Sequence, residues 1–168
     1  MFELDHPEEL ARVSEQLAKA WAFLSGEQRR FELLVGKNEL LQFTEFSFFM
    51  PLAVHEEGRD GGVGVLIQRE DAIHVATHMF GVPHDEVREA EMRDACSEVC
   101  NVLADCMARH FSLDQAVSVA LPARASTVEF EQIAENSTAR AVYRGCAGTR
   151  CLLIVVYDSL ISCSEVNP

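Results

Sequence analysis

The chain has 168 residues, of which 48% are hydrophobic, and this is enough for one domain with a substantial core. The net charge of -13 argues against binding to nucleic acid or to an anionic membrane, and it favours a partner that presents Lys or Arg. No apolar run approaches the roughly 20 residues that a membrane-spanning helix needs. The acidic start MFELDHPEEL lacks the positive charge of a secretory signal, so we expect a cytoplasmic protein.

The first part of the chain predicts an amphipathic helix followed by strands. The helix is expected over Asp5–Leu24, where apolar residues recur at spacings of three and four, and Asp5 can cap it. Strands are expected at Phe31–Gly36, Leu41–Val54 and Gly62–Gln68. The sequence HEEGRDGG predicts a turn between the last two. Pro51 indicates an edge position or a local break in the strand that contains it.

The second part predicts two helices and then further strands. The helices are expected at about Asp71–Phe80 and Asp85–Phe111. Strands are expected at Val117–Leu121, Thr127–Ile133, Ala139–Arg144 and Cys151–Tyr157. This order indicates an α/β (α+β) fold with a mostly antiparallel sheet covered by long helices. We expect one domain over residues 1–168, with its core at about 5–158 and a frayed tail after Leu160.

The cysteines do not form the paired C-x-x-C pattern of a metal or disulfide framework. Cys96, Cys100 and Cys106 fall on the predicted long helix, and Cys146 and Cys151 flank a turn. Buried free cysteines pack as small hydrophobic residues. The sequence therefore favours reduced, structural thiols over a redox role, and a zinc site is less favoured still.

The predicted long helix carries a narrow polar stripe. At about 100° per residue, Asp94, Glu98, Asn101 and Asp105 project within roughly 60° of one another. The opposite side carries the apolar set Met92, Ala95, Cys96, Val99, Leu103 and Cys106. A carboxylate one turn before an amide can bind a cation while the amide orients a water molecule. This stripe is the candidate active site, and a solvated helix face is its structural alternative.

Other motifs have more ordinary interpretations. His74 and His78 are spaced for one helix face, but a third zinc ligand is not evident, so surface or partly packed histidines are favoured. The glycines of GRDGGVGV precede a strand rather than a helix, which indicates a hairpin turn and not a phosphate-binding loop. A run of aromatic residues in acidic surroundings favours a packed core over a base-stacking surface. It comprises Phe43, Phe46, Phe48 and Phe49.

The stripe and its surroundings resemble the CheX branch of the CheC/CheX/FliY phosphatases of bacterial chemotaxis. The pattern [DS]-x-x-x-E-x-x-N of that family is matched by Asp94, Glu98 and Asn101, and Pro122 follows at the end of the next predicted strand. The segment GVGVLIQREDAIHVATHMFG is similar to the strand and helix that precede the signature helix in CheX proteins. A second E-x-x-N on another helix is missing, as in single-site CheX and unlike two-site CheC.

The resemblance implies a phosphatase that acts on the aspartyl phosphate of a CheY-like response-regulator receiver domain. Glu98 would dock against a Lys of the receiver, and Asn101 would position the attacking water. Asp94 and Asp105 would add electrostatic attraction for this partner. The chain would need no cofactor of its own, because the receiver would supply Mg²⁺. The resemblance also implies a homodimer.

Asp105 departs from the family pattern, because many members have Gly at its position. The extra carboxylate makes the helix bulkier and more acidic where a partner would dock. It keeps a second hypothesis open, in which the chain is a non-catalytic receiver-binding or adaptor module of a chemotaxis or two-component pathway. Phosphate release at substoichiometric protein distinguishes the two hypotheses.

Overall fold

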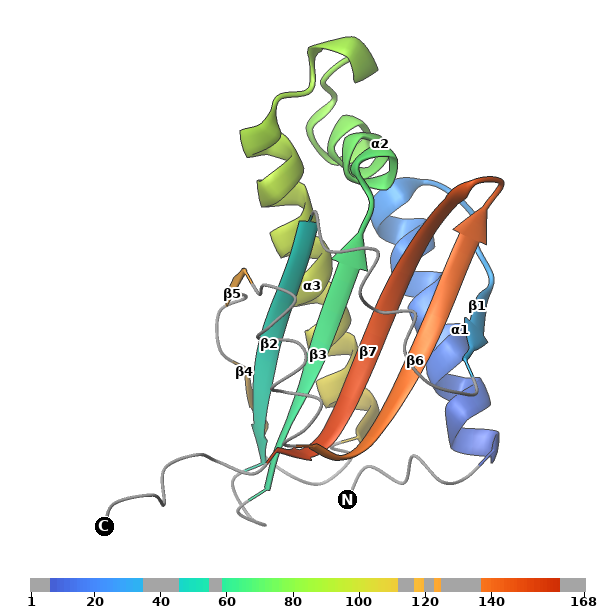
Figure 1. Cartoon of the computed structure of the whole chain (residues 1–168), viewed down its shortest axis with the longest axis vertical. Helices are drawn as coiled ribbons and strands as arrows, with labels where there is room; N and C mark the ends of the chain where they lie inside the picture. Colours follow the sequence, from blue (N-terminus) through green and yellow to red (C-terminus); the bar gives the residue numbers. More distant parts are fainter. Residues whose placement is uncertain are drawn as a thin grey trace, which may run out of the picture.

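Two long helices lie along one face of an antiparallel sheet (Figure 1). The structure is a computed structural model, and it describes residues 7–34, 46–54, 59–111, 117–119, 123–124 and 137–160. Helices α1 (Pro7–Ser25) and α3 (Glu89–Phe111) pack on the sheet, and α2 (Arg69–Phe80) lies beyond one end of it. No helix in these ranges is long and apolar enough to cross a membrane.

The sheet has seven strands, and all of its recorded pairings are antiparallel. The strands are β1 (Phe31–Leu33), β2 (Phe46–Val54), β3 (Arg59–Ile67), β4 (Val117–Val119), β5 (Ala123–Arg124), β6 (Ser137–Ala147) and β7 (Arg150–Leu160). Their order across the sheet is β1-β6-β7-β3-β2-β4, with β5 also paired to β2. The predicted α+β class with an antiparallel sheet is thus confirmed.

Helix α1 forms where the spacing of apolar residues predicts it. Its buried face carries Val13, Leu17, Trp21 and Leu24, which recur every three or four residues and turn one stripe toward the sheet. The predicted cap Asp5 lies outside the described residues. The chain leaves the helix at Gly26, whose φ of 68° suits a residue without a β-carbon.

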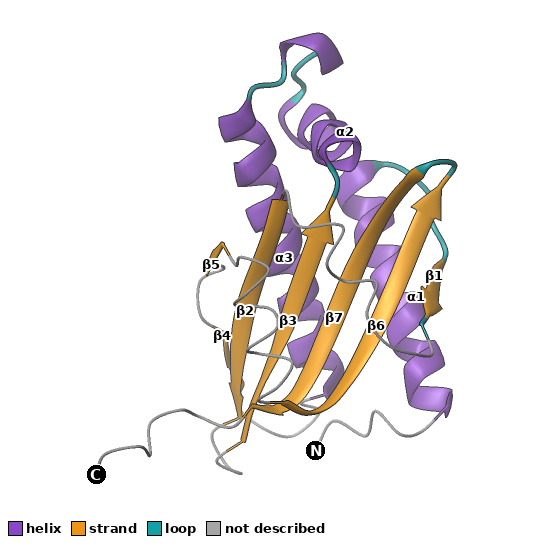
Figure 2. Cartoon of the chain, in the orientation of Figure 1, coloured by secondary structure: helices purple, strands orange, loops and turns teal. Residues whose placement is uncertain are grey.

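The long helix begins later than the sequence predicts. In place of one helix from Asp85, a short 3-10 turn covers His84–Glu86, and an extended Val87 (ψ of 123°) separates it from α3. The backbone N–H of Arg88 then donates to Oε2 of Glu91, which satisfies one of the unpaired donors at the start of α3. Figure 2 shows this short turn between α2 and α3. The prediction was wrong here because the spacing of apolar residues does not reveal that one residue has an extended backbone.

Three of the strand predictions are corrected in their bounds. Strand β3 begins at Arg59 and so includes part of the predicted turn HEEGRDGG. Strands β6 and β7 both extend beyond the predicted segments, because each pairs with the other along its full length. Pro51 does not break β2, which pairs with β3 on both sides of it. On its other side, β2 pairs with β5 at Phe48 and Phe49 and with β4 from Leu52, so Pro51 falls between these two partners.

Some predictions fall on parts of the chain outside the described ranges. These are the strand at Thr127–Ile133, the position of Pro122, the side chain of Phe43 and the fraying after Leu160. Strand β4 confirms the first residues of the strand predicted at Val117–Leu121.

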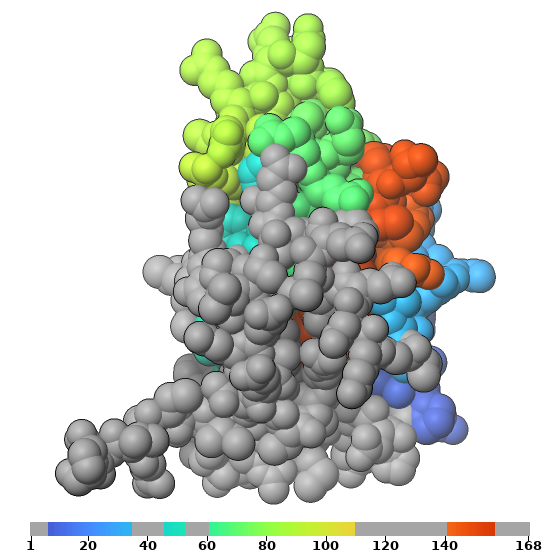
Figure 3. Space-filling model, in the orientation of Figure 1, coloured from blue at the N-terminus to red at the C-terminus, as the bar shows by residue number. Residues whose placement is uncertain are grey.

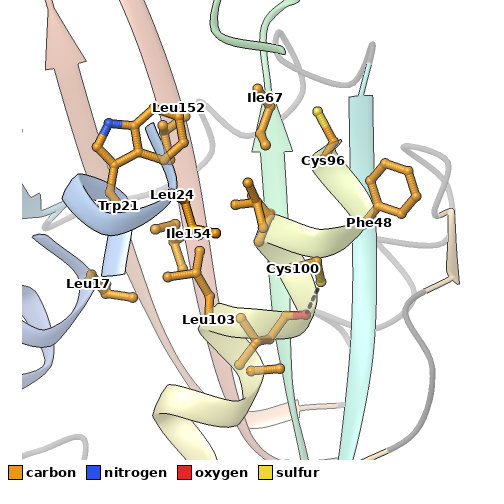
Figure 4. Packing of buried hydrophobic residues seen from close by; sticks show 14 of the residues in the cluster. Leu17, Trp21, Leu24, Phe48, Ile67, Cys96, Cys100, Leu103, Leu152 and Ile154 are labelled. Atoms are coloured by element: carbon orange, nitrogen blue, oxygen red, sulfur yellow. Dashed lines mark hydrogen bonds between the residues drawn. The ribbon is translucent and has the colours of Figure 1, made fainter. Parts of the chain in front are cut away.

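The core lies between the sheet and the two long helices (Figure 4). Trp21 and Leu17 of α1 face Leu152 and Ile154 of β7, while Leu103 of α3 lies against the same layer. Burial of a large apolar side chain stabilises a fold by about 1.5–3 kcal/mol, so this layer fixes α1 and α3 on the sheet. The expectation of a packed aromatic core is confirmed for Phe46 and Phe48, which are buried.

The prediction that all the cysteines are reduced was wrong for one pair. Cys146 of β6 and Cys151 of β7 are joined by a disulfide. Cys96, Cys100 and Cys106 are free, as predicted. The spacing of five residues across a turn gave little sign of a bridge, but the register of the β6–β7 hairpin places the two cysteines directly opposite each other.

Candidate functional site

Helix α3 presents the predicted polar stripe on the side away from the core. Asp94, Glu98 and Asp105 are exposed, and Asn101 is half-buried. On the opposite side, Met92, Ala95, Cys96, Val99 and Leu103 are buried, and Cys106 is half-buried. The apolar face therefore fixes the rotation of α3, and this rotation turns the four polar side chains outward. In Figure 1 the helix lies behind the sheet.

Glu98 and Asn101 are in contact with each other. The Nδ2 of Asn101 lies 3.4 Å from the Oε2 of Glu98, at the long end of the hydrogen-bond range. A contact of this length between solvent-facing groups exchanges readily with water. The carboxylate and the amide are thus side by side and open to a partner, which is the geometry that the candidate site requires.

Asp105 is not an unpaired carboxylate. Its Oδ2 lies 2.7 Å from the Nη2 of Arg109, one turn further along α3. Both side chains are more than half exposed, so the pair contributes only about 0.2–1 kcal/mol to stability. The ion pair places a positive charge beside the negative stripe. Sequence reasoning missed Arg109, although its spacing of four residues from Asp105 is the usual signal for such a pair.

A buried cluster of charges lies at the end of the sheet near α2, and sequence reasoning missed it. Arg29 donates to both carboxylate oxygens of Asp71, at 2.8 and 2.9 Å, and both side chains are fully buried. Arg29 also contacts Glu27 at 2.6 Å, and its guanidinium lies 4.9 Å from the ring centroid of Trp21. Arg150, at the start of β7, pairs with Glu27 and lies 3.1 Å from Asp71.

The charges in this cluster stabilise one another. Burial alone would lower the pKa of Arg29, but its hydrogen bonds and ion pairs with Asp71 and Glu27 outweigh this effect and raise it. Burial would raise the pKa of Glu27, but Arg29 and Arg150 outweigh it and lower the pKa. The cluster joins the end of α1, the first turn of α2 and the β6–β7 hairpin. It therefore holds elements in place rather than presenting a site to solvent.

The two histidines of α2 pack against the end of α1. The Nδ1 of His78 lies 2.9 Å from the carbonyl oxygen of Leu24, and the Nε2 of His74 lies 4.0 Å from Glu27. Within the described ranges, no three side chains of His, Cys, Asp or Glu are grouped to hold a metal ion. His74 is half-buried and His78 is exposed, so their interpretation as surface or partly packed histidines is confirmed.

The two cysteines on the core side of α3 are buried thiols of low reactivity. Burial raises the pKa of Cys100 to about 12, and it raises the pKa of Cys96 further, with smaller contributions from Asp71 and Cys100. The thiol of Cys100 lies 3.8 Å from the carbonyl oxygen of Val63, as the dashed line in Figure 4 marks. Both groups therefore stay protonated at neutral pH, and they contribute to packing together with this weak hydrogen bond from Cys100.

Comparison with solved structures shows the fold. No protein-family model and no curated protein matches the chain. A CheC-like superfamily protein from Shewanella sp. PV-4 is similar with a TM-score of 0.68 and 11% identity, over 92% of this chain and 99% of that one. The CheX–CheY–BeF3–Mg complex from Borrelia burgdorferi gives a TM-score of 0.65 at 13% identity, over 89% of this chain and 97% of that one.

A third similar structure is not named as a CheC or CheX protein. It is the FliM–SpeE complex from H. pylori, with a TM-score of 0.61 and 9% identity over 95% of this chain and 90% of that one. The chain therefore has the fold of the CheC/CheX-like chemotaxis proteins, and this agrees with the resemblance in its sequence.

Proposed function

We propose that this chain is a phosphatase that acts on a CheY-like receiver domain and removes the phosphoryl group from an aspartyl side chain. The observation that carries the proposal is the open pair formed by Glu98 and Asn101 on α3. A similar structure, CheX from Borrelia burgdorferi, was solved with CheY, BeF3 and Mg. The fold and the signature residues point to the same class of partner.

Glu98 is suited to dock the receiver. Its carboxylate is exposed and lies on a stripe with Asp94, in a chain with a net charge of -13. A Lys ammonium group of the receiver would pair with Glu98, and Asp94 would strengthen the attraction over a longer range. Once water is excluded from the contact, removal of one charge of such a pair costs about 2–5 kcal/mol of binding free energy.

Asn101 is suited to position water. When a partner draws Glu98 away, the amide of Asn101 is released from its weak contact and can hold a water molecule. The water oxygen attacks phosphorus, the bond between phosphorus and the aspartyl oxygen breaks, and inorganic phosphate leaves with the carboxylate restored. This reaction depends mainly on positioning and charge stabilisation. A hundredfold acceleration requires about 2.7 kcal/mol of barrier reduction. The Mg²⁺ of the receiver would supply charge stabilisation, so this chain needs no metal ligand of its own.

The second candidate is a binding module without turnover. The ion pair between Asp105 and Arg109 favours it, because Asp105 lies one turn beyond Asn101, where the family often has Gly, and Arg109 adds a positive charge one turn further along. The similar FliM structure, solved with SpeE, is consistent with a protein-binding role for this fold. In this alternative the stripe holds a receiver but does not hydrolyse its phosphate.

Measurement of phosphate release separates the two candidates. CheY-like receivers from the same genome are phosphorylated with a small phosphodonor, and the half-life of the phosphoryl group is followed with substoichiometric chain. We expect the wild type to shorten the half-life about a hundredfold and Asn101→Ala to lose most of this effect. Gln28→Ala, which removes an exposed amide away from α3, is the matched control.

Binding is tested on the same receivers with beryllofluoride and Mg²⁺. Glu98→Gln should weaken binding, whereas Glu15→Gln removes the same charge from the exposed side of α1 and should not. If the wild type binds but does not shorten the half-life of any receiver, the binding module is correct. If it neither binds nor hydrolyses, the proposal fails.

The proposal includes a homodimer and a cytoplasmic location, as expected for a member of the family that the sequence resembles. Sedimentation at several protein concentrations tests the first, and fractionation of cells tests the second. A chain that stays monomeric at high concentration would contradict the dimer and leave the assignment of Glu98 and Asn101 to be tested by the assays above.

A further inference from the structure

The end of the β6–β7 hairpin holds two cysteines in register. Cys146 and Cys151 are direct cross-strand partners, with their Cα atoms 4.2 Å apart. They are followed toward the turn by the pair of Ala147 and Arg150, and Gly148 in the turn has a φ of 61°. Two sulfur atoms on directly opposed residues of antiparallel strands stay close even when they are not bonded. The backbone therefore keeps the pair ready to form a disulfide.

One of the two cysteines of the disulfide is exposed to solvent. Cys146 is exposed and Cys151 is half-buried. Figure 3 shows the end of this hairpin in orange-red at the molecular surface, next to α2 in green. Exposed disulfides exchange with thiols far more readily than buried ones, because the attacking thiolate must reach a sulfur atom. An incoming thiolate can reach Cys146 more easily than Cys151.

The hairpin does not depend on the disulfide for its position. Arg150 pairs with Glu27 and with Asp71, and the backbone N–H of Cys151 donates to Oε1 of Gln68 at 3.1 Å. The ladder between β6 and β7 also continues from this end to Ser137. These contacts remain when the bond between the sulfurs is broken. Reduction should thus leave two facing thiols on a folded hairpin.

We propose that Cys146 and Cys151 form a reversible thiol–disulfide site for low-molecular-weight thiols. A thiolate attacks the sulfur of Cys146, the bond between the two cysteines breaks, and Cys151 leaves as a thiolate that takes up a proton. A second thiolate then attacks the outer sulfur of the mixed disulfide and releases Cys146. In sum, two thiols are oxidised to one disulfide while one protein disulfide is reduced to two thiols. Oxidised low-molecular-weight disulfide drives the same steps in reverse.

Peptide mapping after equilibration with glutathione tests the site. The full chain is incubated in buffers from fully oxidised to fully reduced glutathione, quenched with acid, alkylated and digested with trypsin. Trypsin releases Cys146 in the peptide GCAGTR and Cys151 in the peptide CLLIVVYDSLISCSEVNP. Because the second peptide also contains Cys163, the measurement is repeated with Cys163→Ser. Circular dichroism of each sample reports whether the chain stays folded.

We expect the linked peptide to change from nearly complete to nearly absent across the series, reversibly and without unfolding. The buried thiols of Cys96 and Cys100 serve as internal controls and should stay unlabelled by an alkylating agent in the folded chain. Two single variants compare the reactivity of the two sulfur atoms. Oxidised glutathione should form a mixed disulfide with Cys146 in the Cys151→Ser variant several-fold faster than it does with Cys151 in the Cys146→Ser variant.

Four results would overturn the inference. The first is a pair that stays reduced in fully oxidised glutathione, and the second is a disulfide that is reduced only when the chain unfolds. The third is equal or reversed reactivity of the two single variants, which would refute the attack on Cys146. Persistence of the linked peptide in Cys163→Ser identifies Cys151 as the partner, whereas its loss there assigns the bridge to Cys163 and refutes the site.

Discussion

The substitution Asp71→Asn is expected to destabilise the chain strongly. Asp71 and Arg29 are both fully buried, and two hydrogen bonds of 2.8 and 2.9 Å join them. The change removes one charge but keeps the size of the side chain and one oxygen that accepts a hydrogen bond. Any loss of stability therefore measures the effect of removing the charge and not the effect of creating a cavity.

Breaking a buried ion pair from one side typically costs 3–5 kcal/mol, because the other charge stays buried without compensation. Here Glu27 remains 2.6 Å from Arg29 and compensates part of its charge, so we expect the lower end, about 3 kcal/mol. For a urea dependence of about 2 kcal/mol per molar, the unfolding midpoint would fall by about 1.5 M. This is a large part of the 5–15 kcal/mol that usually stabilises a domain.

Urea titrations followed by circular dichroism measure the effect. Glu15→Gln is the matched control, since it removes a carboxylate from the exposed pair with Lys19 and should cost less than about 0.5 kcal/mol. In the double variant Arg29→Met/Asp71→Asn, part of the stability should return, because no uncompensated Arg is left. The reasoning is refuted if Asp71→Asn costs less than about 1 kcal/mol or if the double variant is less stable than the single one.

Three further predictions concern other parts of the chain. The pKa of Glu27 is lowered in the folded state from its ordinary value of 4.5. The stability that Glu27 contributes is therefore present above pH 4.5 and is lost as the pH falls through the folded pKa. Glu27→Gln should thus make the free energy of unfolding depend less steeply on pH in the acid range. Arg109→Ala should change the free energy of unfolding by less than about 1 kcal/mol, but it frees Asp105. On the proposed function, it should therefore tighten receiver binding at low salt and have no effect at about 1 M salt. Gly145→Ala should cost about 1–3 kcal/mol in urea titrations, because a β-carbon there would lie 2.5 Å from the ring of Phe31; an unchanged midpoint would contradict this packing.

Periodicity was sufficient to predict the helices and the orientation of the candidate site. The apolar residues of α3 face the core because they recur at helical spacing, and this places Glu98 and Asn101 outside. The contact between these two side chains also follows from their spacing of three residues. Periodicity did not predict the start of α3. Val87 interrupts the helix through its extended backbone conformation, which the pattern of apolar residues does not show.

The charged cluster and the disulfide were missed for different reasons. Arg29 and Asp71 are 42 residues apart, and Asp71 and Arg150 are 79 residues apart, so only the folded sheet brings them together. Cys146 and Cys151 are close in sequence, but a bridge requires them to be directly opposed. That condition depends on the register of the hairpin, which is fixed by the length of its turn.

The position of β6 between β1 and β7 has a consequence for synthesis on the ribosome. Glu27 and Arg150 are separated by 123 residues, so at 5–20 residues per second the nascent chain waits roughly 6–25 s between them. During this time β1 lacks β6, its only partner among the described strands, and Arg29 can pair with Glu27 and Asp71. The β6–β7 hairpin, which follows the other described strands in the chain, must therefore insert between β1 and β3 and complete the sheet. A truncated chain without this hairpin would expose the edge of β3 to other nascent chains and would be prone to aggregate.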